Sequence, residues 1–416
     1  MQIEFIMTIQ REIYMIKFNC FLFFVSSLLC CNLAIDVAAQ DSMQTGKQLK
    51  FRKADIPIEG EYISAVFHID SLTQELRPKI IVRKESVDFM TGEGVLKHCV
   101  VTPNGRFATV AKNGAYIGFY LKGGYHFYGS CGEFLWQDAE WEDTEGPGRL
   151  YKISSLGIVC NINSDVGRII FHDLQGAVLA EHDITNGMSR TLIGEWSQDG
   201  HRFLASGPAA DSPGDYQLHL LEARGTKLWV KKIGRKWPLA ITFSPHAQWV
   251  CVYYHDWDSG NSQNMIISTQ NAEVLIDSLN FNNPQFTPDE QRLVAISFTR
   301  LVFFDLTSGR KVAETDLVKR IRGFHVSVDE KTIYAMHHGE VSPQEPASRK
   351  AASNESLPID VEMWALNLDG KVLSQFMLHH VTDKPGSMRI HPASTSRDFY
   401  LSTPEGWRRF SAQDEQ

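Results

Sequence analysis

The residues best suited to binding chemistry lie in one short segment that is rich in tryptophan and acidic residues. Within residues 132–146, Trp136 and Trp141 alternate with carboxylates, Asp138 among them. Indole faces stack on sugar rings and attract cations, and the nearby acids would hold a basic partner. We therefore expect a ligand-binding loop at Trp136, Asp138 and Trp141. The alternative is a connecting loop whose tryptophans pack into the core while its acids are solvated.

A second group of candidate residues, Asp256, Trp257 and Asp258, lies between two apolar, strand-like runs. Two carboxylates and the amide of Asn261 are the hard oxygen ligands that calcium takes. However, Gly260 and Asn261 stand in the wrong order for an EF-hand loop, and no bidentate glutamate follows at the required spacing. The pattern favours a solvated turn, with Asp256, Trp257 and Asp258 kept as candidate ligand-binding residues. No cofactor is predicted, and calcium is the one ion these residues would suit.

Motifs that mark a catalytic or metal centre are missing from the sequence. Residues 337–338 and 379–380 are histidine pairs, but adjacent residues on a strand face opposite ways and do not easily chelate one ion. The sequence holds no Gly-x-Ser-x-Gly elbow, His-Glu-x-x-His pair or phosphate loop. We therefore predict no catalytic residue, although an active site assembled from distant segments would leave no local motif.

The cysteines indicate neither a zinc site nor a redox motif. Outside the first 39 residues they are Cys99, Cys131, Cys160 and Cys251, widely spaced and without a Cys-x-x-Cys pair. Cys160 and Cys251 lie in apolar runs and are expected to be buried free thiols. The sequence leaves open whether Cys99 and Cys131 form a disulfide.

The elements that would position these residues repeat along the chain. A short signature, Ser or Thr followed by a polar turn and an apolar run, begins at Thr102, Ser154, Ser197, Ser244, Thr287, Ser327 and, loosely, His391. Proline, Asp or Asn, and glycine favour a tight turn, and the apolar, β-branched residues that follow predict a buried strand. Periods of roughly 40–50 residues with this pattern are typical of propeller blades.

A second hairpin follows most signatures. Its turn carries a glycine between two alternating strands, at Gly176, Gly225, Gly309 and Gly370, and Asn271 stands in the corresponding turn of another copy. Two hairpins per repeat give four antiparallel strands per blade.

The fold class is therefore all-β, a single seven-bladed β-propeller that spans residues 96–416. The last repeat has room for only three strands, so we expect a strand from the N-terminal extension, residues 40–95, to complete it and close the ring. Residues 61–68 and 77–83 are the candidates. Eight blades are the alternative, if residues 50–95 form a blade of their own. The polar insertion at 338–360 is expected to be a loop.

The repeat resembles that of bacterial extracytoplasmic propellers of the WD40-like, YncE-like and TolB-like kind. The resemblance rests on the Ser-Pro-Asp-Gly type of turn and on the Asp-x-x-x-Gly hairpins, and it covers most of residues 100–416. The segment from Leu221 to Trp229 is also similar to the repeat of quinoprotein (PQQ-type) propellers, but the other hairpins lack the tryptophan. Such a resemblance implies the fold and leaves the function open, because propellers host binders, scaffolds and enzymes alike.

The N-terminus has the three parts of a secretory signal peptide. Lys17 precedes an apolar run over residues 18–35, and Val37, Ala38 and Ala39 follow it. We predict cleavage after Ala39, which leaves no transmembrane segment, and a periplasmic or extracellular location. An uncleaved anchor is the alternative, since the run is near the lower limit for spanning a bilayer.

Composition narrows the class of partner. The formal net charge of −8 gives no basic footprint for nucleic acid. We expect an exported, monomeric propeller that acts as a binding or scaffold module for a protein or carbohydrate partner. The alternative is a hydrolase or lyase that acts on a sugar or lactone at the mouth of the central channel.

Overall fold

The computed structural model describes residues 50–413 except 56–63, 70–75, 84, 92–94, 102–107, 122, 140–148, 186–191, 210, 213, 327–331, 339–358, 383–388, 393–397 and 404–405. Every regular element of the described residues is a β-strand, which confirms the all-β prediction. The strands form eight antiparallel sheets of four, numbered here as blades 1 to 8 in chain order.

The first four blades follow the chain in simple up-and-down order. Their strands are β2 (Ser64–Ile69), β3 (Leu76–Val82), β4 (Ser86–Met90) and β5 (Leu96–Val101) in blade 1; β6 (Thr109–Val110), β7 (Tyr116–Leu121), β8 (Gly124–Gly129) and β9 (Phe134–Asp138) in blade 2; β10 (Arg149–Ile153), β11 (Val159–Asn163), β12 (Arg168–His172) and β13 (Val178–Asp183) in blade 3; and β14 (Ile193–Trp196), β15 (Arg202–Pro208), β16 (Tyr216–Glu222) and β17 (Lys227–Gly234) in blade 4.

The next three blades repeat this order, and the last one adds a strand from the start of the chain. Their strands are β18 (Lys236–Phe243), β19 (Trp249–Asp256), β20 (Asn261–Ser268) and β21 (Val274–Leu279) in blade 5; β22 (Asn282–Phe286), β23 (Arg292–Ser297), β24 (Arg300–Asp305) and β25 (Lys311–Asp316) in blade 6; β26 (Gly323–Val326), β27 (Ile333–His338), β28 (Ile359–Leu366) and β29 (Val372–Thr382) in blade 7; and β30 (Arg389–Pro392), β31 (Asp398–Thr403), β32 (Gly406–Gln413) and β1 (Lys50–Asp55) in blade 8.

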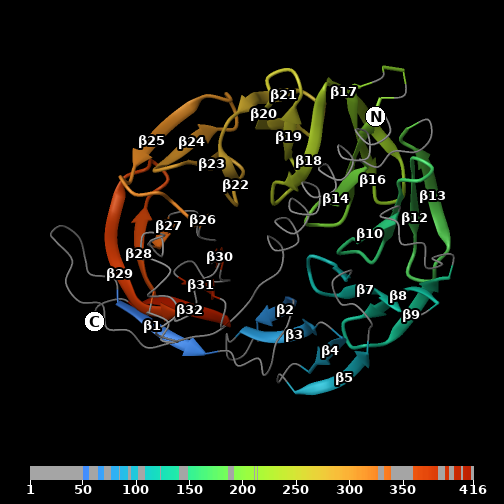
Figure 1. Ribbon diagram of the computed structural model, residues 1–416, viewed down its shortest axis with the longest axis horizontal. Helices are drawn as coiled ribbons and strands as arrows, with labels where there is room; N and C mark the ends of the chain where they lie inside the picture. The colour runs from blue at the N-terminus through green and yellow to red at the C-terminus, as the bar shows by residue number, and fades with distance from the viewer. Residues whose placement is uncertain are drawn as a thin grey trace, which may run out of the picture.

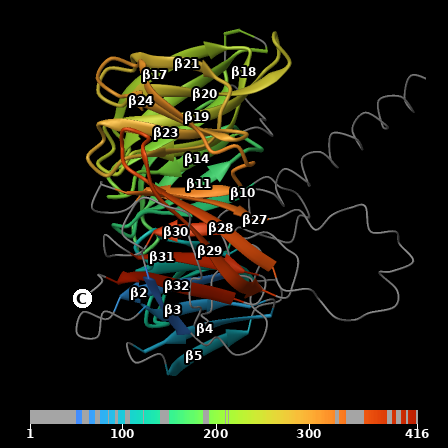
Figure 2. The same cartoon turned by 90° about the vertical axis from the view of Figure 1, so that its left-hand side faces the viewer.

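The eight blades follow one another round a ring, as Figure 1 shows, with first strands such as β14, β22 and β26 nearest the middle. The edge view shows the sheets of successive blades stacked side by side (Figure 2). This arrangement of four-stranded antiparallel sheets is a β-propeller.

The hydrophobic core lies between neighbouring blades. Leu204 of blade 4 packs with Val252 of blade 5, and Phe303 of blade 6 packs with Trp364 of blade 7. In the described residues, clusters of this kind join blade 1 to blade 2 and each later blade to the one after it, up to the pair of blades 7 and 8. Central strands are covered on both faces, so they are apolar almost throughout rather than alternating.

The signature turn connects the first and second strands of a blade, and its hydroxyl is buried. The Ser197 side chain is fully buried, and its oxygen accepts a hydrogen bond of 2.9 Å from the backbone N–H of Arg202. Ser244 and Thr287 do the same for Trp249 and Arg292. The fourth residue of each turn takes a left-handed conformation, with φ of 78° at Gly200, 56° at Ala247 and 57° at Glu290.

The glycines of the second hairpin also adopt the conformation that the pattern predicts. They join the third and fourth strands, where a residue with positive φ is needed. The φ values are 83° at Gly176, 87° at Gly225, 68° at Gly309 and 79° at Gly370. In blade 5 the left-handed residue is Ala272, with φ of 60°, rather than Asn271.

Of the two blade counts, the structure has eight. Residues 64–101 form blade 1, so the propeller begins within the segment that was expected to be an N-terminal extension. The signature at Thr102 lies outside the described residues. In blade 2 the corresponding backbone hydrogen bonds are made by the turn from Ala111 to Tyr116, which has alanine in place of Ser or Thr.

An N-terminal strand completes the last blade, as predicted, but it is neither of the two candidate strands. β1 pairs with β32, with Lys50 opposite Gln413 and Asp55 opposite Arg408. The two candidates, residues 61–68 and 77–83, contribute instead to β2 and β3 of blade 1. The insertion expected at 338–360 lies outside the described residues except for its ends.

Candidate functional site

Two of the predicted binding residues, Trp136 and Asp138, lie on β9 and are engaged with blade 3. The indole of Trp136 stacks on Phe127 at 4.5 Å between ring centroids, and a Cβ at Gly176 would come within 2.9 Å of that indole. Asp138 accepts hydrogen bonds from the Tyr151 hydroxyl at 2.5 Å and from the Asn161 amide at 3.4 Å. These contacts match the packing alternative for Trp136. Trp141 lies outside the described residues.

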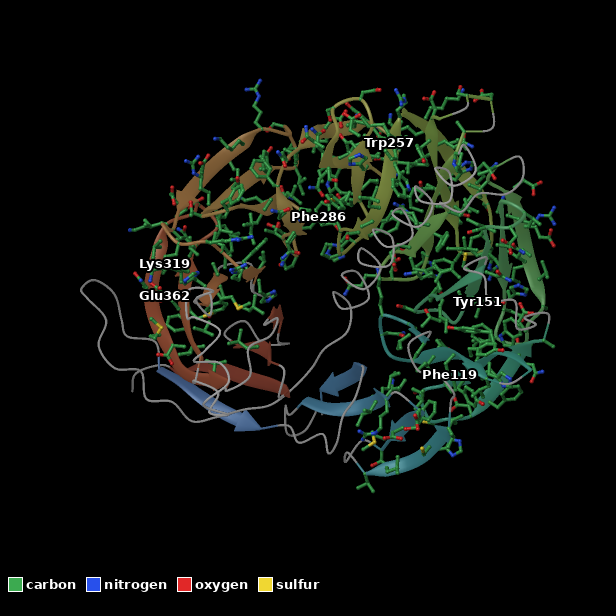
Figure 3. The ribbon with its side chains drawn as sticks, in the orientation of Figure 1. Phe119, Tyr151, Trp257, Phe286, Lys319 and Glu362 are labelled. Carbon is green, nitrogen blue, oxygen red and sulfur yellow. The ribbon has the colours of Figure 1, made fainter. Side chains whose placement is uncertain are left out.

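The other predicted residues, Asp256, Trp257 and Asp258, form the turn between β19 and β20. Asp256 fixes this turn, because its carboxylate accepts the backbone N–H of Asp258 and the hydroxyl of Ser259, both at 3.0 Å. The first of these hydrogen bonds contributes most to lowering the pKa of Asp256, followed by the second. Figure 3 shows Trp257 at blade 5 and Tyr151, the partner of Asp138, two blades away in blade 3. The two predicted groups are therefore separate.

The turn presents an aromatic cluster to solvent. Trp257 is 49% exposed, and its ring is parallel to that of Trp237, with an angle of 2° and 5.8 Å between centroids. His255 meets the Trp257 ring edge-on at 4.9 Å. Offset-stacked and edge-to-face arrangements of this kind are the preferred ones for aromatic pairs. The cluster is thus held in place while one side of Trp257 stays accessible.

Charged residues surround the aromatic cluster. Arg235 donates to the Asp258 carboxylate at 2.8 Å, and its carbonyl accepts the backbone N–H of Trp257 at 3.2 Å. Nearby, Lys236 pairs with Asp277 at 2.5 Å. Burial alone would lower the pKa of Lys236, but the hydrogen bond and charge of Asp277 outweigh it and raise the pKa. The result is an aromatic centre with a polar, charge-balanced border.

The sequence did not reveal Trp237, Arg235 or His255 as parts of this site. Their proximity depends on the register of β18 against β19, in which Trp237 is opposite His255 and Lys236 opposite Asp256. The Arg235-Lys236-Trp237 run was the available signal, but it indicates nothing until the partner strand is known.

Removing calcium is expected to leave the stability of the protein unchanged. Both Asp256 oxygens accept hydrogen bonds within the turn and Asp258 is paired with Arg235, so calcium would have to compete with these partners. The described residues hold no group of three or more His, Cys, Asp or Glu that could bind a metal. Thermal unfolding with calcium and with EDTA should give the same midpoint. A midpoint that falls by several degrees on chelation would contradict this and would support calcium binding at the turn.

The four described cysteines are free. Cys160 and Cys251 are buried, as predicted, and burial raises the pKa of Cys251 to about 12. Cys99 and Cys131 are exposed and not joined to each other. No helix among the described residues has the length and hydropathy needed to cross a bilayer.

Comparisons with known proteins give weak likenesses. No family model matches the chain, and no curated protein matches it. Among solved structures, a chain of the mitotic checkpoint complex is 10% identical with a TM-score of 0.42, covering 74% of this chain and 90% of its own. A eukaryotic initiation factor chain is 11% identical (TM-score 0.45; coverage 79% and 91%), and the hydrazine synthase of Kuenenia stuttgartiensis is 18% identical (TM-score 0.39; coverage 64% and 76%). Likenesses at this level carry no argument about function.

Proposed function

We propose that the protein is an exported scaffold propeller that binds a partner protein through Trp257 and the residues around it. The observation that carries the proposal is the half-exposed Trp257 ring, stacked on Trp237 within a hydrogen-bonded turn. Residues that dominate protein interfaces are mostly Trp, Tyr and Arg, surrounded by polar residues that exclude water. Arg235, Asp256 and Asp258 supply such a border here.

The rigidity of the turn supports the proposal. A side chain that is already ordered loses little conformational entropy on binding, so more of its contact energy remains as affinity. Trp257 is ordered by its neighbours, because its ring meets Trp237 of β18 and His255 of β19 and its backbone N–H donates to the Arg235 carbonyl.

Replacing Trp257 with alanine is expected to weaken partner binding strongly without unfolding the protein. Loss of an interface hot spot costs about 2 kcal/mol or more, which is roughly thirtyfold in Kd. The immobilised protein would be used to capture partners from an extract of the organism that makes it, and the affinity of each captured protein would then be measured by calorimetry. Phe134→Ala is the matched control, because Phe134 is 54% exposed on blade 2.

The proposal would fail if both variants bound the captured protein like the wild type, or if Phe134→Ala weakened binding as much as Trp257→Ala. It would also fail if the captured material were carbohydrate alone. A loss confined to Trp257→Ala, with unchanged thermal unfolding, supports it.

Export is the second part of the proposal, and it rests on the signal-like pattern that ends at Ala39. We expect the full chain, expressed in a bacterial host, to be recovered outside the cytoplasm with Gln40 as its first residue. N-terminal sequencing and intact mass give the answer. A protein that stays with the cytoplasmic fraction and keeps residues 1–39 would refute export while leaving partner binding open.

A further inference from the structure

A pocket of about 480 Å³ lies over blade 5, on the face of the ring that carries the signature turns. It is lined by the β20–β21 turn, by Arg202 from blade 4 and by Thr307 from blade 6. Small-molecule sites usually measure roughly 300–1,000 Å³. The pocket is therefore large enough for a compact ligand.

The sequence of blade 5 explains why the pocket is there. Arg202 is the fifth residue after Ser197, and Arg292 is the fifth residue after Thr287. Each arginine side chain reaches the turn between the third and fourth strands of the next blade. Arg202 donates to the Ala247 carbonyl at 2.8 Å and to the Thr269 hydroxyl at 2.5 Å. Arg292 donates to the carbonyl of Leu368 and to Asp369.

In blade 5 the fifth position is Trp249, and the arginine bridge to the next blade is replaced by an indole. An indole carries a single N–H in place of the five donors of a guanidinium. Trp249 packs partly on the cluster between blades 5 and 6 and forms one wall of the pocket. The space that an arginine bridge would fill is left open next to an aromatic side chain.

Apart from Leu275, the remaining lining is polar and nearly uncharged. It consists mainly of amides and hydroxyls, with one basic and one acidic residue, Arg202 and Glu273. The amide groups of Gln248 and Gln270 are exposed and make no side-chain hydrogen bond to the described residues. Amides both donate and accept, so they match hydroxyl groups, which do the same.

We propose that this pocket binds a small neutral carbohydrate, with the apolar face of a sugar ring against Trp249 and its hydroxyls on the amides of Gln248 and Gln270. The site is independent of partner binding at Trp257. Trp249 begins β19 and Trp257 follows its end, so about eight strand residues, roughly 25 Å, separate the two.

Saturation-transfer NMR on the full chain tests the proposal, with the methyl glycosides of glucose, galactose, mannose and N-acetylglucosamine as probes at millimolar concentration. We expect transfer to at least one glycoside, reduced at least fivefold in Trp249→Leu and in the double variant of Gln248→Ala and Gln270→Ala. Trp257→Leu should leave it unchanged. The double variant alters only exposed side chains, so it stays informative if Trp249→Leu fails to fold.

The proposal is overturned if none of the four glycosides receives transfer from the wild type. It is equally overturned if the double variant keeps the full effect, or if Trp257→Leu removes it. Partner binding at Trp257 is measured separately by calorimetry, so failure at one site is distinguishable from failure at the other.

Discussion

Trp196→Ala is expected to lower the free energy of unfolding by about 3–5 kcal/mol, the cost of removing a large aromatic side chain from a packed core. Trp196 is 1% exposed between blades 3 and 4. Its ring meets Phe203 at 4.8 Å and Phe171 at 5.6 Å, and its indole N–H donates to the Lys152 carbonyl at 3.2 Å. Alanine leaves a cavity and removes that hydrogen bond.

Urea unfolding followed by circular dichroism measures the change as a shift of the midpoint. Trp257→Ala serves as the control, because Trp257 is half-exposed and its loss should change stability by about 1 kcal/mol or less. Equal destabilisation by the two variants would show that the junction between blades 3 and 4 does not carry the stability assigned to it.

Acidification is expected to destabilise the protein between pH 6.5 and 4 through His219. This histidine is 3% exposed on β16, and neither ring nitrogen has a hydrogen-bond partner. Burial, followed by the charges of Lys227 and His182, lowers its pKa to about 4. In the unfolded chain a histidine takes up a proton below about pH 6.5. Unfolding therefore binds a proton in this window, and stability falls as the pH falls.

The expected loss is about 3 kcal/mol, since each pKa unit corresponds to about 1.4 kcal/mol. Below pH 4 both states are protonated and this contribution stops changing. His219→Leu removes the titrating group and the unsatisfied nitrogens, so the variant should be at least as stable as the wild type at pH 7 and lose about 3 kcal/mol less on acidification to pH 4. Urea midpoints at several pH values test this. Parallel pH profiles for the two proteins would contradict it.

Local features of the fold could be predicted from the sequence because they depend on neighbouring residues. Ser197, Ser244 and Thr287 mark the turn between the first and second strands of a blade. The glycine of the second hairpin marks the turn between its third and fourth strands. Each signal acts within a few residues of chain, through a hydroxyl that caps the turn or a backbone that takes positive φ.

Features that depend on distant pairing could not be predicted in this way. Counting signatures gave seven where the structure has eight blades. Blade 1 gave no recognisable copy and the blade 2 turn begins with Ala111, while the copy counted at Thr102 falls between β5 and β6, which belong to different blades. The tryptophan at 136 fits both a binding loop and a core contact by type and spacing, and only its stacking on Phe127 distinguishes them. The neighbours of Trp257 likewise follow from strand register.

The pairing of β1 with β32 also determines when folding can finish. Lys50 and Gln413 lie at opposite ends of the described chain, yet they are partners in one sheet. Contacts this distant in sequence form late, because loop closure must come first. Until β1 arrives, β32 exposes a free edge that can accept a strand from another copy of the chain. Loss of residues 50–55 would therefore leave the β32 edge unpaired in every copy and favour edge-to-edge association and aggregation.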